Sequence, residues 1–115
     1  MKLKLIATLV FAAASAAFTA APAVAVAVDA DAAQALAKKS GCLKCHAIDK
    51  TKKGPPFKKT AAKYKGKTDG EAKLIDNITK APMVKFEDGT EEEHKVVETK
   101  DMKEIKNLVQ WILAQ

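Results

Sequence analysis

The sequence predicts one small all-α domain of about four helices, with a hairpin-like loop before the last helix. In four segments beyond residue 28, apolar residues recur every three or four positions, which is the spacing of one helix face. Asp-Gly at residues 88–89 separates two short stretches and favours a turn between extended arms. The chain has 115 residues and no internal repeat beyond residue 30, so a single domain is expected.

Residues 1–27 are predicted to be a cleaved secretory signal peptide. A short basic start precedes an uncharged apolar run, Leu5–Phe18, and small residues follow. The Ala-x-Ala sites end at Ala25 and Ala27, so we expect cleavage after one of them. The alternative is an uncleaved anchor, but the apolar run is shorter than the roughly 20 residues that span a membrane. The domain is then residues 28–115, soluble and exported to the periplasm.

The first helix is expected to begin at an aspartate and to end near Gly41. Asp29 and Asp31 are both suited to the cap, because a carboxylate accepts hydrogen bonds from the free N–H groups of a first turn. The residues on its core-facing side are Ala33, Leu36 and Ala37. The spacing of these residues predicts a helix in which they share one face.

Two further helices are predicted after a lysine-rich loop that Pro55-Pro56 closes. The first spans Phe57–Tyr64, and the second spans Glu71–Lys80, where Pro82 stops it. Glycines 66 and 70 separate the two. The residues expected to face the core are Ala61 in the first helix and Leu74, Ile75 and Ile78 in the second.

The stretch from Met83 to Val97 reads as a hairpin-like loop, because its second arm, Glu91–His94, is poor strand material. The last helix follows. Asp101 is its predicted cap, and Glu104 stands three residues on, which is the spacing of a capping box. Its apolar face comprises Ile105, Leu108, Val109 and Ile112, with Trp111 beside it.

The chemistry of the chain is concentrated in C-x-x-C-H at residues 42–46, the attachment sequence for c-type haem. Thiols three positions apart on a helical turn face the same way, so both reach the vinyl groups on one porphyrin edge. His46 follows directly and can bind the iron. One haem would also add core material to a domain of this size, which buries only about 60–65% of its unfolded surface.

Three other uses of Cys42 and Cys45 are weaker. A disulfide between them closes too short a loop to stabilise the chain much. A thioredoxin-like redox pair needs a βαβ context, which the pattern does not offer. A zinc site would need His46 or His94 and one more ligand, and no further thiolate is present. The predicted cofactor is therefore one covalent haem c with its iron.

The chain resembles the small bacterial class I cytochromes c of the c551/c552 type over residues 30–80 and 99–115. The matching motifs are Gly41–Asp49, Gly54–Phe57, Ala61–Tyr64 and Trp111–Gln115. The resemblance implies the class I fold wrapped round one haem, thioethers at Cys42 and Cys45, and His46 as proximal iron ligand. It also implies that the carbonyl of Pro55 accepts a hydrogen bond from the other imidazole nitrogen.

The distal iron ligand departs from the family pattern, in which a methionine flanked by prolines stands some sixteen residues before the tryptophan. His94 lies 17 residues before Trp111 and is the favoured distal ligand. Met83 follows a proline but lies 28 residues before the tryptophan, and it is the alternative. Met102 stands too close to the cap of the last helix. A thioether would raise the reduction potential and a second imidazole would lower it.

The resemblance implies a soluble periplasmic protein that carries single electrons. The alternative is a haem-based sensor, ligand-binding or peroxidase-like protein with an open sixth iron position. No pattern of a nucleophile or an acid–base pair is present, so an enzyme is not predicted. We also expect a monomer without stable membrane insertion.

Charge is unevenly divided along the chain. Residues 38–67 contain eleven lysines and one acid, whereas residues 68–115 contain seven lysines and eleven acids. Because the resemblance implies an exposed haem edge beside the cysteines, we expect redox-partner proteins to dock acidic patches against the 38–67 surface. The chain has no arginine, and a nucleic-acid partner is not predicted.

Overall fold

The computed structural model describes Ala17, Ala20 and residues 27–115. The signal peptide predicted over residues 1–27 lies outside the described residues, apart from Ala17, Ala20 and Ala27. Within the described part of the chain, no helix is both long and apolar enough to cross a membrane.

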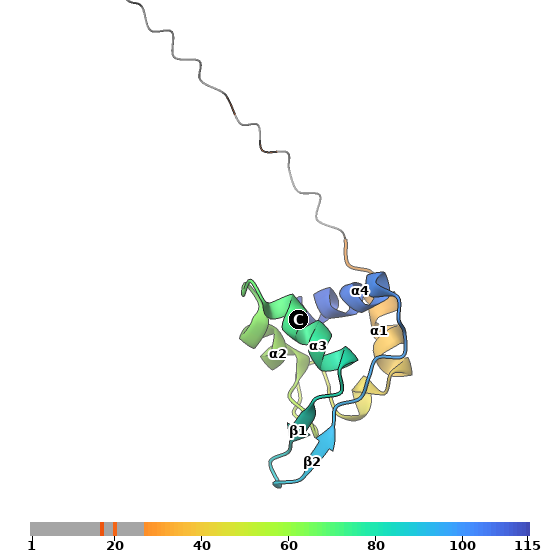
Figure 1. Ribbon diagram of the computed structural model, residues 1–115, viewed down its shortest axis with the longest axis vertical. Helices are drawn as coiled ribbons and strands as arrows, with labels where there is room; N and C mark the ends of the chain where they lie inside the picture. Colours follow the sequence, from red (N-terminus) through yellow and green to blue (C-terminus); the bar gives the residue numbers. More distant parts are fainter. Residues whose placement is uncertain (1–16, 18–19, 21–26) are drawn as a thin grey trace, which may run out of the picture.

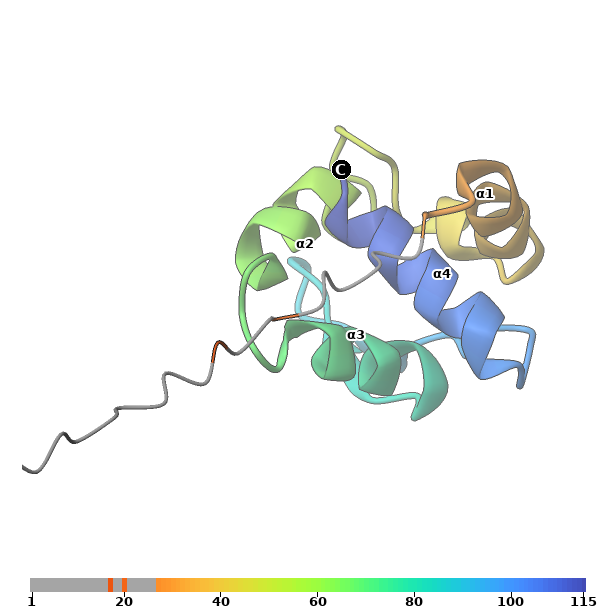
Figure 2. The same ribbon diagram turned by 90° about the horizontal axis from the view of Figure 1, so that it is seen from above.

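The described residues form four α-helices, one short 3-10 helix and a two-stranded hairpin (Figure 1). In chain order they are α1 (Ala30–Lys39), η1 (Cys42–Lys44), α2 (Phe57–Tyr64), α3 (Gly70–Thr79), β1 (Met83–Lys85), β2 (Glu91–Glu93) and α4 (Met102–Leu113). Helices α1, α2 and α3 all pack against α4, which crosses the molecule between α1 and the other two (Figure 2). The predicted all-α class with a hairpin before the last helix is confirmed.

Helix α4 is central because its apolar face is the longest in the chain. Its side chains at Leu108 and Val109 are fully buried. Trp111 meets the ring of Phe57 edge-on, with ring centres 5.5 Å apart, which joins α4 to α2. At the other end of the core, the Asn107 amide donates to the Asp29 carbonyl at 2.8 Å and accepts from the Asp29 N–H at 2.8 Å.

The helix caps follow the sequence with one difference. Of the two aspartates suited to the cap of α1, Asp29 is the one that caps it, by accepting from the N–H of Ala32 at 3.0 Å, and Asp31 lies in the first turn. Asp101 caps α4 by accepting from the N–H of Lys103 at 2.8 Å. In a capping box, Glu104 would accept directly from the Asp101 N–H. Here the Asp101 N–H donates to the Thr99 hydroxyl, and that hydroxyl donates to Glu104.

The hairpin is a true antiparallel ladder, although its second arm is three glutamates. Met83 lies opposite Glu93 and Lys85 opposite Glu91. The Asp88-Gly89 turn closes it: the Phe86 N–H donates to the Thr90 carbonyl at 2.8 Å, and Gly89 adopts a left-handed φ of 86°. The turn thus outweighs the weak strand propensity of glutamate, and it fixes which side chains of β1 face inward.

Candidate metal centre

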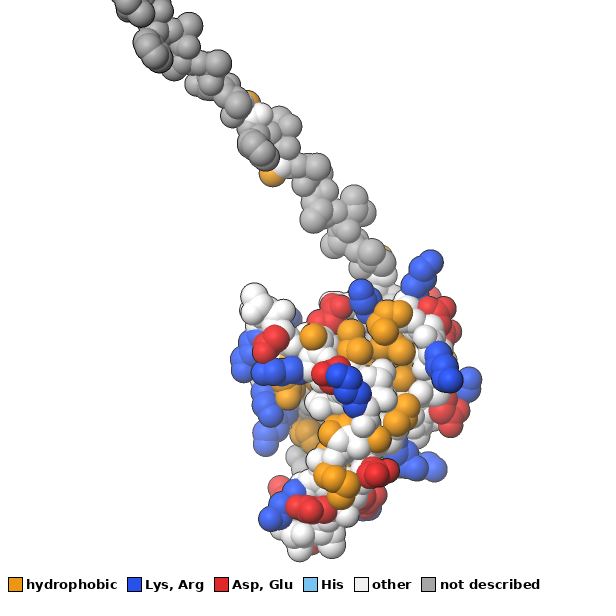
Figure 3. All heavy atoms as spheres, in the orientation of Figure 1, with side chains coloured by type: hydrophobic (Ala, Val, Ile, Leu, Met, Phe, Trp, Pro, Cys, Tyr) orange, Lys and Arg blue, Asp and Glu red, His pale blue; other side chains and the backbone are white. Residues whose placement is uncertain are grey.

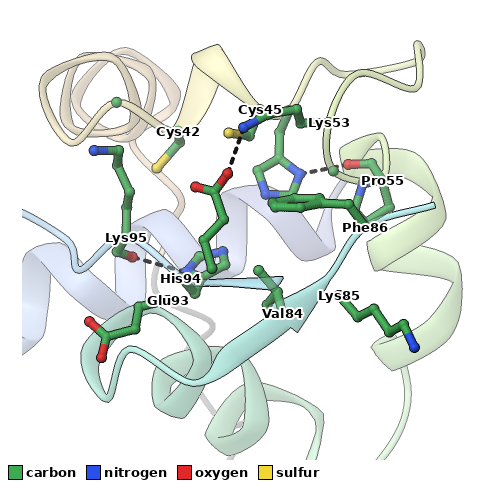
Figure 4. A pocket seen from close by; sticks show the side chains of 14 residues that line it. Cys42, Cys45, Lys53, Pro55, Val84, Lys85, Phe86, Glu93, His94 and Lys95 are labelled. Carbon is green, nitrogen blue, oxygen red and sulfur yellow. Dashed lines mark hydrogen bonds and ion pairs between the residues drawn. The ribbon is translucent and has the colours of Figure 1, made fainter. Parts of the chain in front are cut away.

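The two cysteines are held on one tight turn. Gly41 enters η1 with a left-handed φ of 74°, and the N–H groups of Cys45 and His46 donate to the Cys42 carbonyl at 3.1 and 2.9 Å. Both thiols are free and half-buried, and both line a cavity next to the hairpin (Figure 4). Burial raises the pKa of the Cys42 thiol. The turn therefore presents two thiols and one imidazole to the same space.

His46 is oriented by the loop that follows it. Its Nδ1–H donates to the carbonyl of Pro55 at 2.6 Å, which leaves Nε2 free toward the cavity. The ring of Phe57 stacks on it with ring centres 5.3 Å apart. Burial lowers the pKa of His46, while the Pro55 hydrogen bond opposes that effect. The ring is thus biased toward the neutral form, which is the form that binds metals.

Gly54 permits this arrangement; the sequence analysis placed it in a family-like motif but did not predict it as a site residue. A Cβ added at Gly54 would lie 2.6 Å from Cε1 and 3.0 Å from Nδ1 of His46. Its own N–H donates to the Cys45 carbonyl at 2.8 Å, which folds the loop back beneath the ring. A glycine just before the Pro-Pro pair was the available signal, but its reason is a contact that only the folded chain reveals.

His94 faces His46 from the opposite wall. The ring centres are 6.1 Å apart, and the planes meet at 44°. The Nδ1–H of His94 donates to the carbonyl of Lys95 at 2.9 Å, so this ring also keeps Nε2 free. Two histidines with the same hydrogen-bonding pattern therefore meet across the cavity.

The two methionines considered as distal ligands lie elsewhere. Met83 is 59% exposed, because the alternation of β1 turns its neighbour Val84 inward instead. Met102, the first residue of α4, is 48% exposed. Neither side chain lines the two cavities beside His46.

Two adjoining cavities share Cys42, His46, Pro55, Val84 and His94 in their walls. Their volumes are about 130 and 440 Å³. The larger is walled by the apolar side chains of Phe57, Leu74, Ile78, Leu108 and Ile112. Its polar lining comes from Lys59, Thr60, Lys63, Tyr64 and Asn77, residues of α2 and α3 that the sequence did not indicate as site residues.

This site fits a covalent haem in three respects. Apolar walls would suit the porphyrin, and lysine, hydroxyl and amide groups in the lining of the larger cavity would suit its propionates. Two free thiols lie at the cavity for the vinyl groups. His46 and His94 could hold the iron of such a group, because their rings lie on facing walls with centres 6.1 Å apart.

Sequence comparison identifies relatives of this chain. Residues 30–115 match the family model described as cytochrome c. The chain is 44% identical over 45 residues to cytochrome c-551 of Pseudomonas aeruginosa, a match that covers 39% of this chain and 43% of that protein. It is 33% identical over 79 residues to cytochrome c-552 of Hydrogenobacter thermophilus, which covers 69% of this chain and 76% of the relative. The chain thus spans under half of the first relative and about three quarters of the second.

Two solved structures share the fold. The class 1 cytochrome MtoD from Sideroxydans lithotrophicus ES-1 has a TM-score of 0.73 and 55% identity, over 76% of this chain and 97% of that one. Wild-type cytochrome c552 from Nitrosomonas europaea has a TM-score of 0.55 and 32% identity, over 70% and 95%. Together with the family match over residues 30–115, these likenesses show that the chain belongs to the cytochrome c family, whose members carry one covalently bound haem c.

Proposed function

We propose that this protein is a soluble periplasmic carrier of single electrons, with His46 and His94 as the two axial ligands of its haem iron. The observation that carries this proposal is the approach of the two imidazoles, 6.1 Å apart with both Nε2 atoms free of protein partners in the described hydrogen bonds. When bound, the haem iron supplies the one-electron couple. The chain supplies the ligands, the apolar enclosure and the docking surface.

The proximal side is built to hold one ring orientation. Thioethers at Cys42 and Cys45 would fix the haem edge to η1, and the Pro55 carbonyl would keep the Nδ1 proton of His46 in place. A hydrogen bond at Nδ1 increases the basicity of the other nitrogen, so it strengthens a bond from Nε2 to a metal. Phe57, stacked on the ring, excludes water from that side.

The distal side distinguishes this chain from a methionine-ligated carrier. The Lys95 carbonyl gives His94 the same kind of support that Pro55 gives His46. An imidazole in place of a thioether lowers the reduction potential. The proposed carrier therefore works at a lower potential than a histidine–methionine protein of the same fold. A protein imidazole at the sixth position also leaves no place for a substrate, which argues against an enzyme.

We propose the lysine-rich 38–67 surface as the docking site for redox partners, on the basis of its charge. Leu43 and Ile48, in or just after the turn that carries the cysteines, are 38% and 41% exposed. Exposed lysines precede and follow them along the 38–67 segment. The hairpin segment has a different balance, because Glu87, Asp88 and Glu91–Glu93 are all exposed there; Figure 3 shows acidic groups on it beside lysines. An acidic patch on a redox partner would be steered to the lysine-rich side, so electron exchange should slow as ionic strength rises. One monomer suffices for this role.

The test is an absorption and low-temperature EPR spectrum of the oxidised mature protein beside its His94→Ala variant. We expect a low-spin bis-imidazole signal that is lost in the variant, and no far-red charge-transfer band from a methionine–iron bond. A far-red band that survives in His94→Ala but vanishes in Met83→Leu would overturn the ligand assignment. A high-spin spectrum of the unmodified protein would support an open sixth position and a ligand-binding role.

A further inference from the structure

Lys53, in the loop that precedes Pro55, contacts two residues of the hairpin. The Nζ of Lys53 lies 2.6 Å from Oε1 of Glu92, in β2, and 4.9 Å from the ring centre of Phe86, just after β1. Lys53 belongs to the loop whose end, Gly54-Pro55, supports His46. The hydrogen bond that Lys53 donates to the Glu92 carboxylate raises the pKa of Lys53, so the lysine stays charged.

The inner end of the same segment is fastened independently. The Val97 N–H donates to the Ile78 carbonyl of α3 at 2.8 Å, and the Glu98 N–H donates to the buried Ser40 hydroxyl at 2.9 Å. His94 lies between these bonds and Glu92. The segment that carries His94 is therefore attached on both sides: the N–H groups of Val97 and Glu98 bond to the helices, and Glu92 pairs with Lys53.

The Lys53–Glu92 pair lies in the wall of the smaller cavity. Lys53, Phe86 and Glu92 all line the smaller cavity, whose walls also include His46 and His94. The Lys53–Glu92 ion pair, 2.6 Å long, thus joins two side chains of this lining, and Figure 4 shows the end of the Lys53 side chain beside Cys45. Opening this side of the cavity requires the pair to separate, whereas the bonds at Val97 and Glu98 can stay intact.

We propose that Lys53 is a positioning residue for the distal ligand: paired with Glu92 and resting on Phe86, it holds the His94 arm closed over the sixth iron position. The proposal rests on His94 as the distal ligand, as proposed above. Its consequence is kinetic. A small ligand that competes with His94 binds only after the segment that carries His94 moves away from the cavity. Weakening the Lys53–Glu92 pair should therefore speed that binding.

The size of the effect follows from the exposure of the pair. Both side chains are more than half exposed, and such pairs contribute little to stability. Applied to arm opening alone, a pair of this kind changes the opening equilibrium by about two- to fivefold. Because the charges face solvent, the effect should fade at high salt, where the Debye length shrinks to about 3 Å at 1 M.

The experiment follows imidazole binding to the oxidised holoprotein by stopped-flow absorbance, at low salt and in 1 M NaCl. Lys53→Glu and Glu92→Lys are each expected to speed binding about two- to fivefold at low salt, and the double exchange should return the rate toward that of the unmodified protein. Matched controls are Lys50→Glu in the same loop and Glu91→Lys in the same strand. Neither side chain lines the cavity, so both should leave the rate unchanged.

Restoration by the charge exchange is the decisive result, because a general loss of stability would not be reversed by it. The proposal would be overturned if the binding rate stays high in the double variant, or if the single variants bind imidazole no faster than the two controls. The EPR spectrum of His94→Ala provides a separate test of the ligand assignment on which the proposal rests. If that spectrum equals the unmodified one, His94 is not the ligand and Lys53 cannot be positioning it.

Discussion

The imidazole rings of His46 and His94 lie 6.1 Å apart, although 48 positions separate the two residues in the chain. Each ring is oriented by a hydrogen bond from Nδ1 to a backbone carbonyl, at 2.6 Å for His46 and 2.9 Å for His94. The similarity matters because the two bonds leave the same atom, Nε2, available on both sides of one cavity. The predictions below test this arrangement and the structure that supports it.

Exchanging the distal residue should shift the reduction potential in a known direction. His94→Met replaces an imidazole with a thioether, which favours the reduced iron, so the potential should rise by on the order of 0.1 V within the roughly 0.8 V range that axial ligands span. Protein-film voltammetry gives the value. Met83→Leu serves as the control, since its exposed side chain lies outside the cavity. A large shift in Met83→Leu would show that the methionine, not His94, is bound.

Gly54→Ala should disturb the haem ligand and not only the fold. The added methyl group would stand 2.6 Å from His46 Cε1, so the ring or the loop must move, at a cost of about 1–3 kcal/mol. We expect a changed low-spin spectrum together with a lower denaturation midpoint. In Gly66→Ala the new methyl meets nothing within 4 Å but the φ is 77°, so stability should fall while the spectrum stays unchanged.

Ser40→Ala should loosen the inner end of the arm that carries His94. The buried hydroxyl accepts from the Glu98 N–H at 2.9 Å, and its loss leaves that N–H without its partner. The expected loss in the free energy of unfolding is about 1–3 kcal/mol, measured by urea denaturation. Thr90→Ala provides a comparison, because its hydroxyl bonds to Asp88 at the exposed hairpin tip. An equal loss in both variants would contradict the role given to Ser40.

The carboxyl of Asp69 should titrate below its usual range. Lys73 lies one turn along α3, with its Nζ 2.8 Å from Asp69 Oδ2, and this hydrogen bond lowers the pKa of the aspartate. A lowered pKa means that the unfolded chain binds the proton more readily. The pair therefore stabilises the fold above about pH 3.8 and loses that effect as pH falls through the lowered pKa. Carbon-detected NMR titration measures this pKa, and Lys73→Gln should raise it toward its ordinary value.

A chain without haem should be largely unfolded. The larger cavity, about 440 Å³, lies against core residues of three helices, so its filling belongs to the core. Far-ultraviolet circular dichroism of a Cys42→Ala, Cys45→Ala double variant should show little of the helix content of the holoprotein. Native-like helicity in that variant would show that the helices pack without the cofactor.

The helices and the proximal half of the site were predictable from the sequence because their causes are local. Asp29 and Asp101 cap helices whose N–H donors lie within three residues, and Phe57–Tyr64 begins where Pro56 ends the loop. The spacing of Cys42, Cys45 and His46 likewise requires only one turn of chain. Local hydrogen bonding and periodicity thus explain why the helices, and the turn that carries Cys42, Cys45 and His46, could be predicted.

The tertiary structure alone decided which residue faces His46. From spacing, His94 and Met83 were both possible, and the hairpin register separates them: β1 turns Val84 toward the cavity and Met83 toward solvent, while His94 follows β2 on the inner side. The pairing of Lys53 with Glu92 and the approach of Gly54 to His46 are likewise contacts between separate segments. Sequence patterns determine structure within a turn or two of chain, whereas contacts between distant segments depend on how the whole core packs.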